Sequence, residues 1–345
     1  MSFKNVDRLR KLSNVQLGLE RGSTVHLAET NERWKRSFSD EAYFIFDHLK
    51  DESLRLFHIG STSIPGIAAK PIIDILGAVS SLSELDQKRV IFESIGYEYK
   101  GEYGIQGRRY CVLYNPDKTT AFVHLHIFEH RHPEISKHLL FRDYLRKNTT
   151  AAKEYEALKI DLARVQKIER SKYSDAKNEI ISRLQRSAES HEIKNQKILA
   201  IIGASEGHQN TKKYLAGKFV GKDLEVVDLF DGGLKPYSYQ GIPDDLFFST
   251  IDKLIRSDLT VLATPVYWYA MSGVMKDFID RFSNLMSGKY KHLGEALYGK
   301  RIKVLSTGYD PSLPLGFEVP FAGTAIYFGM DYMGAEYRST QEAFK

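Results

Sequence analysis

The sequence predicts two α/β domains, of which the second is a doubly wound parallel sheet. With 345 residues the chain is long enough for two domains. The run Ile198–Ile202 is apolar on both sides, as in a central parallel strand, and it ends at Gly203 before a polar loop and a helical pattern. Strand and helix patterns then alternate towards the C-terminus. We place the domains at residues 1–194 and 195–345.

Composition narrows the class of protein. A hydrophobic content of 42% allows sizeable cores, and the single cysteine, Cys111, excludes a disulfide framework or a multi-cysteine metal site. The first twelve residues lack the apolar segment of a signal peptide, and no apolar run approaches the length of a membrane span. We therefore expect a soluble cytoplasmic protein with neither a membrane nor a nucleic acid as its partner.

The formal charge of the chain is +5 and is unevenly distributed. Residues 1–194 hold 32 Lys and Arg against 27 Asp and Glu, whereas residues 195–345 hold 17 of each. The basic half points to an anionic ligand in the first domain. The alternative is that most of these charges are solvated side chains on helix faces.

The N-terminal domain follows a recognisable series of elements. We expect a helix over 31–50, with one apolar face, and a strand over 54–59 that enters the turn 60–66. The remaining elements are expected as strand 72–79, helix 82–95, a hairpin of strands 108–114 and 119–128 around residues 115–118, and three helices within 133–192. His124 and His126 share one face of their strand, since alternate residues of a strand point the same way.

Several motifs of this half resemble the GrpB-like family. They are HIGSTSIPGIAAKPIIDI (58–75), FVHLHIF (122–128), LLFRDYLR (139–146), YEALKIDLA (155–163) and YSDAKNEII (173–181). The resemblance implies a nucleotidyltransferase-like α/β fold with a mixed sheet. It also implies an anion-binding cleft formed by Gly60, Ser61, Thr62, Ser63, Lys70, Arg108, Arg109 and Arg142.

The nucleotidyltransferase superfamily places a Gly-Ser turn before two acidic residues, at positions i and i+2, that hold two metal ions. Here Gly60 and Ser61 are present and Asp74 follows, but position 76 is Leu. One carboxylate does not build the two-metal site. Asp74, His124 and His126 form instead a two-histidine, one-carboxylate set of a type that binds a single metal ion. The alternative is that the histidines only form hydrogen bonds within a cleft.

The C-terminal domain is expected to bind its ligand where three strands end. The expected elements are strands 198–202, 224–229, 259–263, 302–306 and 331–337, with helices 211–220, 244–256, 274–285 and 321–328. Loops 203–211, 264–273 and 307–312 follow the first, third and fourth of these strands. Doubly wound sheets bind ligands at the carboxyl ends of their strands, so these loops should converge.

The loops carry the groups that a flavin nucleotide needs. The first loop leads into a helix N-terminus, which favours a phosphate. The second, Thr264–Tyr269, is aromatic and suits a flat ring, although core packing is the ordinary role of such residues.

These motifs resemble the flavodoxin-like NAD(P)H-dependent oxidoreductases of the FMN reductase group. The resemblance rests on KILAIIGASEGHQNT (197–211), LTVLATPVYWYAMSGVMKDFIDRF (259–282) and LSTGYD (305–310). It implies bound FMN, NAD(P)H as co-substrate and a homo-oligomer. The implied FMN site comprises Ser205, His208, Gln209, Asn210, Thr211, Pro265, Val266, Tyr267, Trp268, Thr307, Gly308 and Tyr309.

Two features depart from the FMN reductase group. Ala204 stands where the group usually has Ser, and little sequence follows the fifth strand where the group has a helix. One face of the sheet is therefore open, or is covered by the first domain or by a partner.

The sequence thus predicts an FMN-dependent oxidoreductase domain fused to a GrpB-like domain that binds a nucleotide-like anion, with small molecules as substrates. Two alternatives remain open. The protein is a non-enzymatic sensor of flavin or nucleotide, or its N-terminal domain transfers a nucleotidyl or phosphoryl group.

Overall fold

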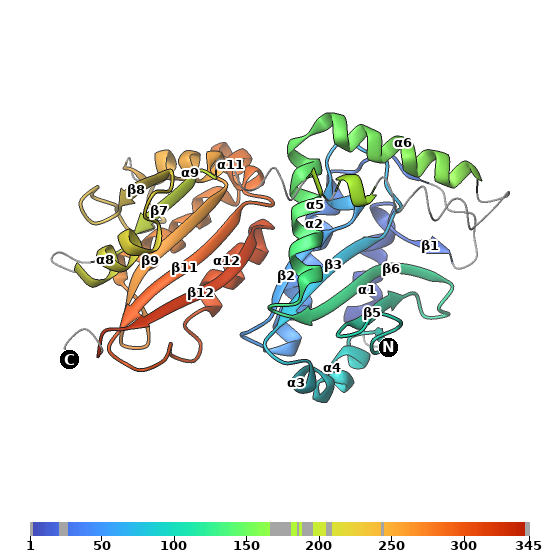
Figure 1. The fold of residues 1–345 in the computed structure, drawn as a ribbon, viewed down its shortest axis with the longest axis horizontal. Coiled ribbons are helices and arrows are strands. Elements are labelled where there is room, and N and C mark those ends of the chain that lie inside the picture. Colours follow the sequence, from blue (N-terminus) through green and yellow to red (C-terminus); the bar gives the residue numbers. More distant parts are fainter. Residues whose placement is uncertain are drawn as a thin grey trace. The chain divides into compact units, whose positions relative to one another are not determined.

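A computed structural model describes residues 3–20, 27–165, 181–184, 186–187, 196–204, 209–242 and 245–341. The chain divides into two compact units, Met1–Lys194 and Asn195–Lys345. Each unit is an α/β structure with its own sheet, and each is described here by itself (Figure 1). None of the described helices is long and apolar enough to cross a membrane.

The N-terminal unit is built on a mixed sheet, as expected. Its elements are α1 (Phe3–Asn14), β1 (Leu19–Glu20), α2 (Arg33–Leu49), β2 (Arg55–Ile59), the 3₁₀ turn η1 (Ser61–Ser63), β3 (Ile73–Val79), α3 (Leu82–Gln87), α4 (Arg89–Ser94), β4 (Tyr97–Tyr99), β5 (Arg109–Tyr114), β6 (Thr120–Glu129), α5 (Pro133–Lys147) and α6 (Thr149–Val165). The strand order is β2-β3-β6-β5-β4, with β1 beside β6. Only the β3–β6 pair is parallel.

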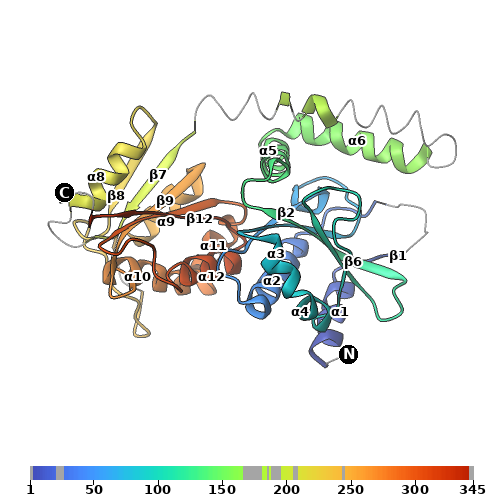
Figure 2. The ribbon, with the colours of Figure 1, turned by 60° about the horizontal axis from the view of Figure 1, so that its bottom comes forward.

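Helices cover both faces of this sheet. Figure 2 shows α5 and α6 on one face and α1 to α4 on the other. Helix α2 buries the face that its sequence predicts, with Trp34, Phe38 and Ile45 among its buried residues. On the opposite face Leu76 of β3 packs in one cluster with Ile135 and Leu139 of α5. Burial on both sides explains why every residue of β2 is buried, Arg55 and His58 included.

The C-terminal unit is a flavodoxin-like sheet. Its elements are β7 (Ile198–Ile202), α8 (Gln209–Lys218), β8 (Leu224–Asp228), α9 (Phe247–Arg256), β9 (Leu259–Tyr267), β10 (Ala270–Met271), α10 (Gly273–Asp280), η2 (Arg281–Leu285), η3 (Gly288–Tyr290), α11 (Lys291–Ala296), β11 (Arg301–Gly308), α12 (Val319–Phe328) and β12 (Asp331–Ser339). Strands β12-β11-β9-β7-β8 pair in parallel, which is the 2-1-3-4-5 order of a doubly wound sheet.

Helix α8 packs on this sheet, and aromatic residues of α9, α10 and η2 pack against one another. Leu215 of α8 packs in a cluster with residues of β7, β9 and β11. Phe247 of α9 contacts Phe278 of α10 and Phe282 of η2, with ring centroids 5.5 and 6.1 Å apart. On β12, Glu336 forms ion pairs with Lys218 and Lys303.

Some expectations about single elements are wrong. The segment 82–95 is two short helices with a break at Lys88, not one helix. The expected loop 264–273 begins as a continuation of β9 to Tyr267. Helix α1, strand β4 and helix α11 were not expected, although α1 buries Leu9 and Leu12 on one face. Most of the last of the three helices expected within 133–192 lies outside the described residues.

A buried ion pair ties the loop after β8 to η2. Arg281 Nη1 lies 2.7 Å from Asp245 Oδ2, and the two side chains are 0% and 2% exposed. The same carboxylate accepts hydrogen bonds from the backbone N–H groups of Lys235 and Phe247. Burial opposes ionisation of Asp245, but the hydrogen bond from Arg281 and the backbone donors lower its pKa overall.

Replacing Asp245→Ala should destabilise the C-terminal unit by about 3–5 kcal/mol, because the buried charge of Arg281 would lose its carboxylate partner. Urea unfolding of the full chain followed by circular dichroism measures the loss. The matched control is Asp280→Ala in the exposed Lys276–Asp280 pair, expected to cost no more than about 1 kcal/mol. Equal effects of the two variants would contradict this account of the buried pair.

Candidate functional sites

The carboxyl ends of β7, β9 and β11 are aligned at one edge of the C-terminal sheet. Ile202 pairs with Ala263, and Thr264 and Pro265 pair with Ser306 and Thr307. Since β7 and β9 flank the point where the strand order reverses, this edge is the switch point of the sheet. The strand ends from which the three expected loops start therefore converge at this edge.

Buried hydroxyl groups bond these strand ends to one another. Ser272 Oγ donates to Gly203 O at 2.6 Å and accepts from the N–H of Met275, which makes it the N-cap of α10. Its own N–H donates to Thr264 Oγ1 at 3.1 Å, and Ser306 Oγ donates to Thr264 O at 2.7 Å. A Cβ on Gly203 would lie 2.7 Å from that of Met275, so this close approach requires glycine.

The N-terminus of α8 carries part of the expected phosphate site. Gln209 and Asn210 are exposed there, whereas Ser205 and His208 lie outside the described residues. Thr211 is fully buried, and its hydroxyl lies 2.7 Å from that of Thr307, which is also buried. The Thr211 hydroxyl therefore bonds the start of α8 to the end of β11 rather than facing solvent. Ala204 stands at the position where the FMN reductase group usually has Ser, and it is buried in the core under α8.

Two aromatic residues stand out from the end of β9 in a strained turn. Trp268 and Tyr269 connect β9 to β10 and are 93% and 69% exposed. Both have positive φ, 47° and 65°, which is uncommon for residues with bulky side chains. Tyr309, after β11, is also exposed, while Pro265 is buried and Val266, Tyr267 and Gly308 are half-buried.

Sequence reasoning missed several residues that shape this edge. Tyr337 of β12 donates its hydroxyl to Asp310 O, and a Cβ on Gly308 would lie 2.8 Å from that hydroxyl. The role of Ser272 as N-cap is readable from a serine directly before a helical pattern. Its bond to Gly203, 69 residues away, has no signal in the sequence.

The second candidate site lies on the α5 face of the N-terminal sheet. Asp74 of β3 is in register with His124 of β6, and Leu76 with His126. One ligand atom from each of Asp74, His124 and His126 lies within 4.8 Å of the others. His124 Nδ1 is 3.3 Å from Asp74 Oδ1, and Tyr110 of β5 packs against both imidazole rings.

The turn η1 fits closely around Asp74. Gly60 has φ of 69°, and a Cβ there would lie 2.2 Å from Asp74 Oδ2. Thr62 Oγ1 donates to Ile72 O at 3.1 Å, which holds the residues before β3 against the turn. Ser63 Oγ donates to Gly60 O at 2.6 Å. The hydroxyls of Thr62 and Ser63 therefore stabilise the turn itself, and both residues are buried.

Two of the expected anion-binding arginines are engaged by other groups of the protein. Arg109 lies opposite Ile127, on the face away from His126, and forms a two-pronged ion pair with Asp86. Arg142 is 1% exposed and bonds to Asp143 and to the backbone oxygen of His58. Both arginines have structural partners that the sequence did not reveal. Ser61, within the turn, and Lys70, two residues before Ile72, are half-exposed.

Arg108, by contrast, does reach the histidine cluster. Its Nη1 lies 3.4 Å from His126 Nδ1, and its Nε and Nη2 donate to the backbone oxygens of Glu102 and Tyr103. Burial lowers the pKa of His126 to about 4, with Asp74 partly offsetting this and His124 and Arg108 adding to it. His126 is therefore a neutral imidazole at neutral pH.

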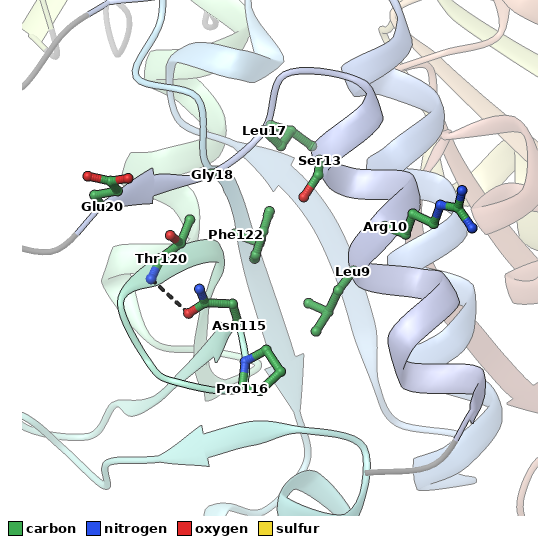
Figure 3. A pocket seen from close by; sticks show the side chains of 10 residues that line it. All are labelled: Leu9, Arg10, Ser13, Leu17, Gly18, Glu20, Asn115, Pro116, Thr120 and Phe122. Atoms are coloured by element: carbon green, nitrogen blue, oxygen red, sulfur yellow. Dashed lines mark hydrogen bonds between the residues drawn. The ribbon is translucent and has the colours of Figure 1, made fainter.

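A cavity of about 550 Å³ lies elsewhere in the N-terminal unit, between α1, β1 and the β5–β6 turn. Figure 3 shows Leu9 and Ser13 of α1 facing Phe122 of β6 across it, and the amide of Asn115 bonded to the N–H of Thr120. Its lining is Leu9, Arg10, Ser13, Leu17, Gly18, Glu20, Asn115, Pro116, Thr120 and Phe122. It contains none of the residues that the sequence singled out.

The two sites and folds define a two-domain protein with a mixed-sheet domain before a flavodoxin-like domain. Comparison with known families agrees: residues 24–187 match the GrpB protein family, and residues 196–315 match the NADPH-dependent FMN reductase family. The chain belongs to the GrpB family through its N-terminal domain, which is fused to a C-terminal domain of the NADPH-dependent FMN reductase family.

Individual relatives resemble one half of the chain or the other. UPF0157 protein YqkA of Bacillus subtilis is 40% identical to this chain over 48% of this chain's length. The chain covers only 47%, about half, of the length of YqkA. Glutamate-rich protein GrpB of Alkalihalophilus pseudofirmus is 31% identical over 49% of this chain and 97% of its own length. YwqN of Bacillus subtilis, named for an NAD(P)H-dependent FMN-containing oxidoreductase, is 26% identical over 40% of this chain and 82% of its own length.

A buried histidine makes the N-terminal unit sensitive to acid. His58 of β2 stacks on Phe38, with ring centroids 4.8 Å apart, and its Nε2 lies 3.1 Å from Thr62 Oγ1. Because the Thr62 hydroxyl donates to Ile72 O, it accepts from the Nε2–H of a neutral ring. Complete burial, with Arg146, Arg142 and Lys35 adding to it, lowers the pKa of His58 well below its ordinary value.

The free energy of unfolding of this unit should therefore fall as pH drops below about 6.5, because unfolding lets His58 take up a proton. His58→Gln keeps a hydrogen-bond donor but does not titrate. Its slope of stability against pH should be smaller by up to about 1.4 kcal/mol per pH unit. Urea unfolding of a Trp268→Phe chain, in which the buried Trp34 is the only tryptophan, measures this by fluorescence. Identical slopes with and without His58 would refute it.

Proposed function

We propose that the protein is an FMN-dependent NAD(P)H oxidoreductase. The observation that carries this proposal is the exposed, positive-φ pair Trp268–Tyr269 at the switch point of a flavodoxin-like sheet. A strained turn that presents bulky aromatics to solvent costs about 1–3 kcal/mol per residue, and such strain persists mainly at functional sites. Membership of the C-terminal domain in the FMN reductase family supports the same function.

The residues present fit the two ends of FMN. The N-terminus of α8 offers backbone N–H groups and the polar side chains of Gln209 and Asn210 to a phosphate. Trp268, Tyr269 and Tyr309 offer exposed aromatic surface to a flat ring. The bonded hydroxyls of Thr211 and Thr307 tie the start of α8 to the end of β11, two residues before Tyr309. When bound, FMN supplies the hydride chemistry, from NAD(P)H to a quinone, a free flavin or another small acceptor.

The full chain should bind one FMN at micromolar concentration or tighter, and FAD more weakly, because the site offers one helix N-terminus to a single phosphate. Titration followed by quenching of flavin fluorescence measures both affinities. Loss of aromatic stacking in Trp268→Ala should weaken FMN binding about three- to tenfold. NADH or NADPH should bleach the visible absorbance of the bound flavin.

The matched control is Tyr239→Ala, which removes an aromatic ring that is 95% exposed on the loop after β8. It should leave FMN affinity unchanged. Absence of quenching at micromolar flavin would overturn the proposed function. Flavin binding without bleaching by either nicotinamide cofactor would favour a sensor over an enzyme.

We also propose that the GrpB domain binds a nucleotide-like anion without two-metal nucleotidyl transfer. Support comes from the glycine turn around Asp74, from the partly exposed Ser61 of that turn and Lys70 ahead of β3, and from the net charge of this half. Leu76, which stands where a second carboxylate is needed, is fully buried against α5. No rearrangement of exposed groups would make this position a metal ligand.

Calorimetry of the full chain with ATP should detect binding that Lys70→Gln weakens about tenfold or more, since bonds to charged groups are worth about 1.5–3 kcal/mol. Lys118→Gln, a charge-matched change at the tip of the β5–β6 hairpin, should have no effect. Pyrophosphate release from ATP with Mg²⁺ would contradict the proposal, as would equal effects of the two substitutions.

A further inference from the structure

We infer that Asp74, His124 and His126 bind a single divalent transition-metal ion in the GrpB domain. The three side chains come from adjacent parallel strands, and their candidate ligand atoms lie within 4.8 Å of one another. Ligand atoms bound to one zinc ion at about 2.0–2.2 Å lie within about 4.4 Å of each other, so small side-chain rotations suffice. The sheet register thus delivers the whole ligand set to one point.

The positions of residues on β3 and β6 explain why the ligand set combines one carboxylate with two imidazoles. In β3 the side chain two residues after Asp74 points to the same face, and this residue is Leu76. Leu76 packs with Ile135 and Leu139, so the position belongs to the core. His126 lies beside Leu76 on the neighbouring strand, and His124 lies beside Asp74. The two imidazoles of β6 therefore supply candidate ligand atoms beside Asp74, whereas β3 itself supplies no second carboxylate.

This ligand set selects the class of metal. Mg²⁺ and Ca²⁺ prefer oxygen ligands, whereas imidazole suits Zn²⁺, Fe²⁺, Co²⁺ and Ni²⁺. Two neutral imidazoles and one carboxylate leave a divalent ion with a net positive charge and with open coordination positions. The site is accessible, since the side chains of His124 and Asp74 are 23% and 30% exposed.

Neighbouring residues pack against the three ligand side chains and place a positive charge beside them. The absence of a Cβ on Gly60 lets Asp74 sit against the turn, and Tyr110 packs against both imidazole rings. Arg108 is fixed by the backbone oxygens of Glu102 and Tyr103, with its Nη1 near His126. A fixed guanidinium beside a positively charged ion favours an anion in the open positions.

Metal titration of the full chain tests this inference. After treatment with a chelator, the protein should bind one Zn²⁺ in competition with a chromogenic indicator. Co²⁺ should give the visible absorption of a nitrogen- and oxygen-ligated ion. His124→Gln and His126→Gln should each weaken Zn²⁺ binding by more than about 100-fold, beyond the effect of changing an outer hydrogen-bond partner. Asp74→Asn, which keeps the shape of the side chain, should also weaken it.

Two other histidines serve as controls. His48, on α2, and His292, on α11, lie outside the cluster and bond to the backbone oxygens of Phe44 in α2 and Lys289 in η3. Substitution of either by Gln should leave Zn²⁺ affinity unchanged, and circular dichroism verifies the fold of every variant. Absence of stoichiometric Zn²⁺ binding by the unmodified chain would overturn the inference. Binding that survives His124→Gln, His126→Gln and Asp74→Asn in folded protein would overturn it equally.

Discussion

The C-terminal site depends on buried hydroxyl groups that join the ends of three strands. Ser272 bonds to Gly203, Ser306 bonds to Thr264, and Thr211 bonds to Thr307. Each bond links segments that are far apart in the sequence and gives these buried hydroxyls a partner. These bonds connect the strand ends beside the hairpin from which Trp268 and Tyr269 extend into solvent. A flat cofactor would meet a preformed surface, which lowers the entropy lost on binding.

The N-terminal site depends on a different constraint, the register of a parallel strand pair. Because β3 and β6 are aligned so that Asp74 faces His124, a carboxylate and two imidazoles share one patch of the sheet. The position that would complete an acidic pair is occupied by Leu76, which the core under α5 requires to be apolar. Packing and ligand chemistry thus act on neighbouring residues of one strand, and packing determines the identity of position 76.

Sequence reasoning succeeded where one segment carries the whole signal. The apolar run Ile198–Ile202, the buried face of α2 and the side-by-side placement of His124 and His126 follow from periodicities of single elements. It failed for Arg109, which pairs with Asp86 on the other face of the sheet. It also failed to foresee that the Thr211 hydroxyl bonds to Thr307. Both partners are distant in the sequence. A polar residue looks the same in the sequence whether its side chain binds a ligand or another residue.

The sequence by itself determined the two-domain organisation, the families of the two halves, the order of most strands and helices, and the residue types available at each loop. These properties depend on local patterns and on motifs that can be read along the chain. The tertiary structure alone decided which of those residues meet. It put Asp74 within reach of His124, held Arg142 against the backbone of His58, and placed Trp268 and Tyr269 in a strained, exposed turn. Such contacts are set by strand register and side-chain packing across the fold, and no single segment of the sequence encodes them.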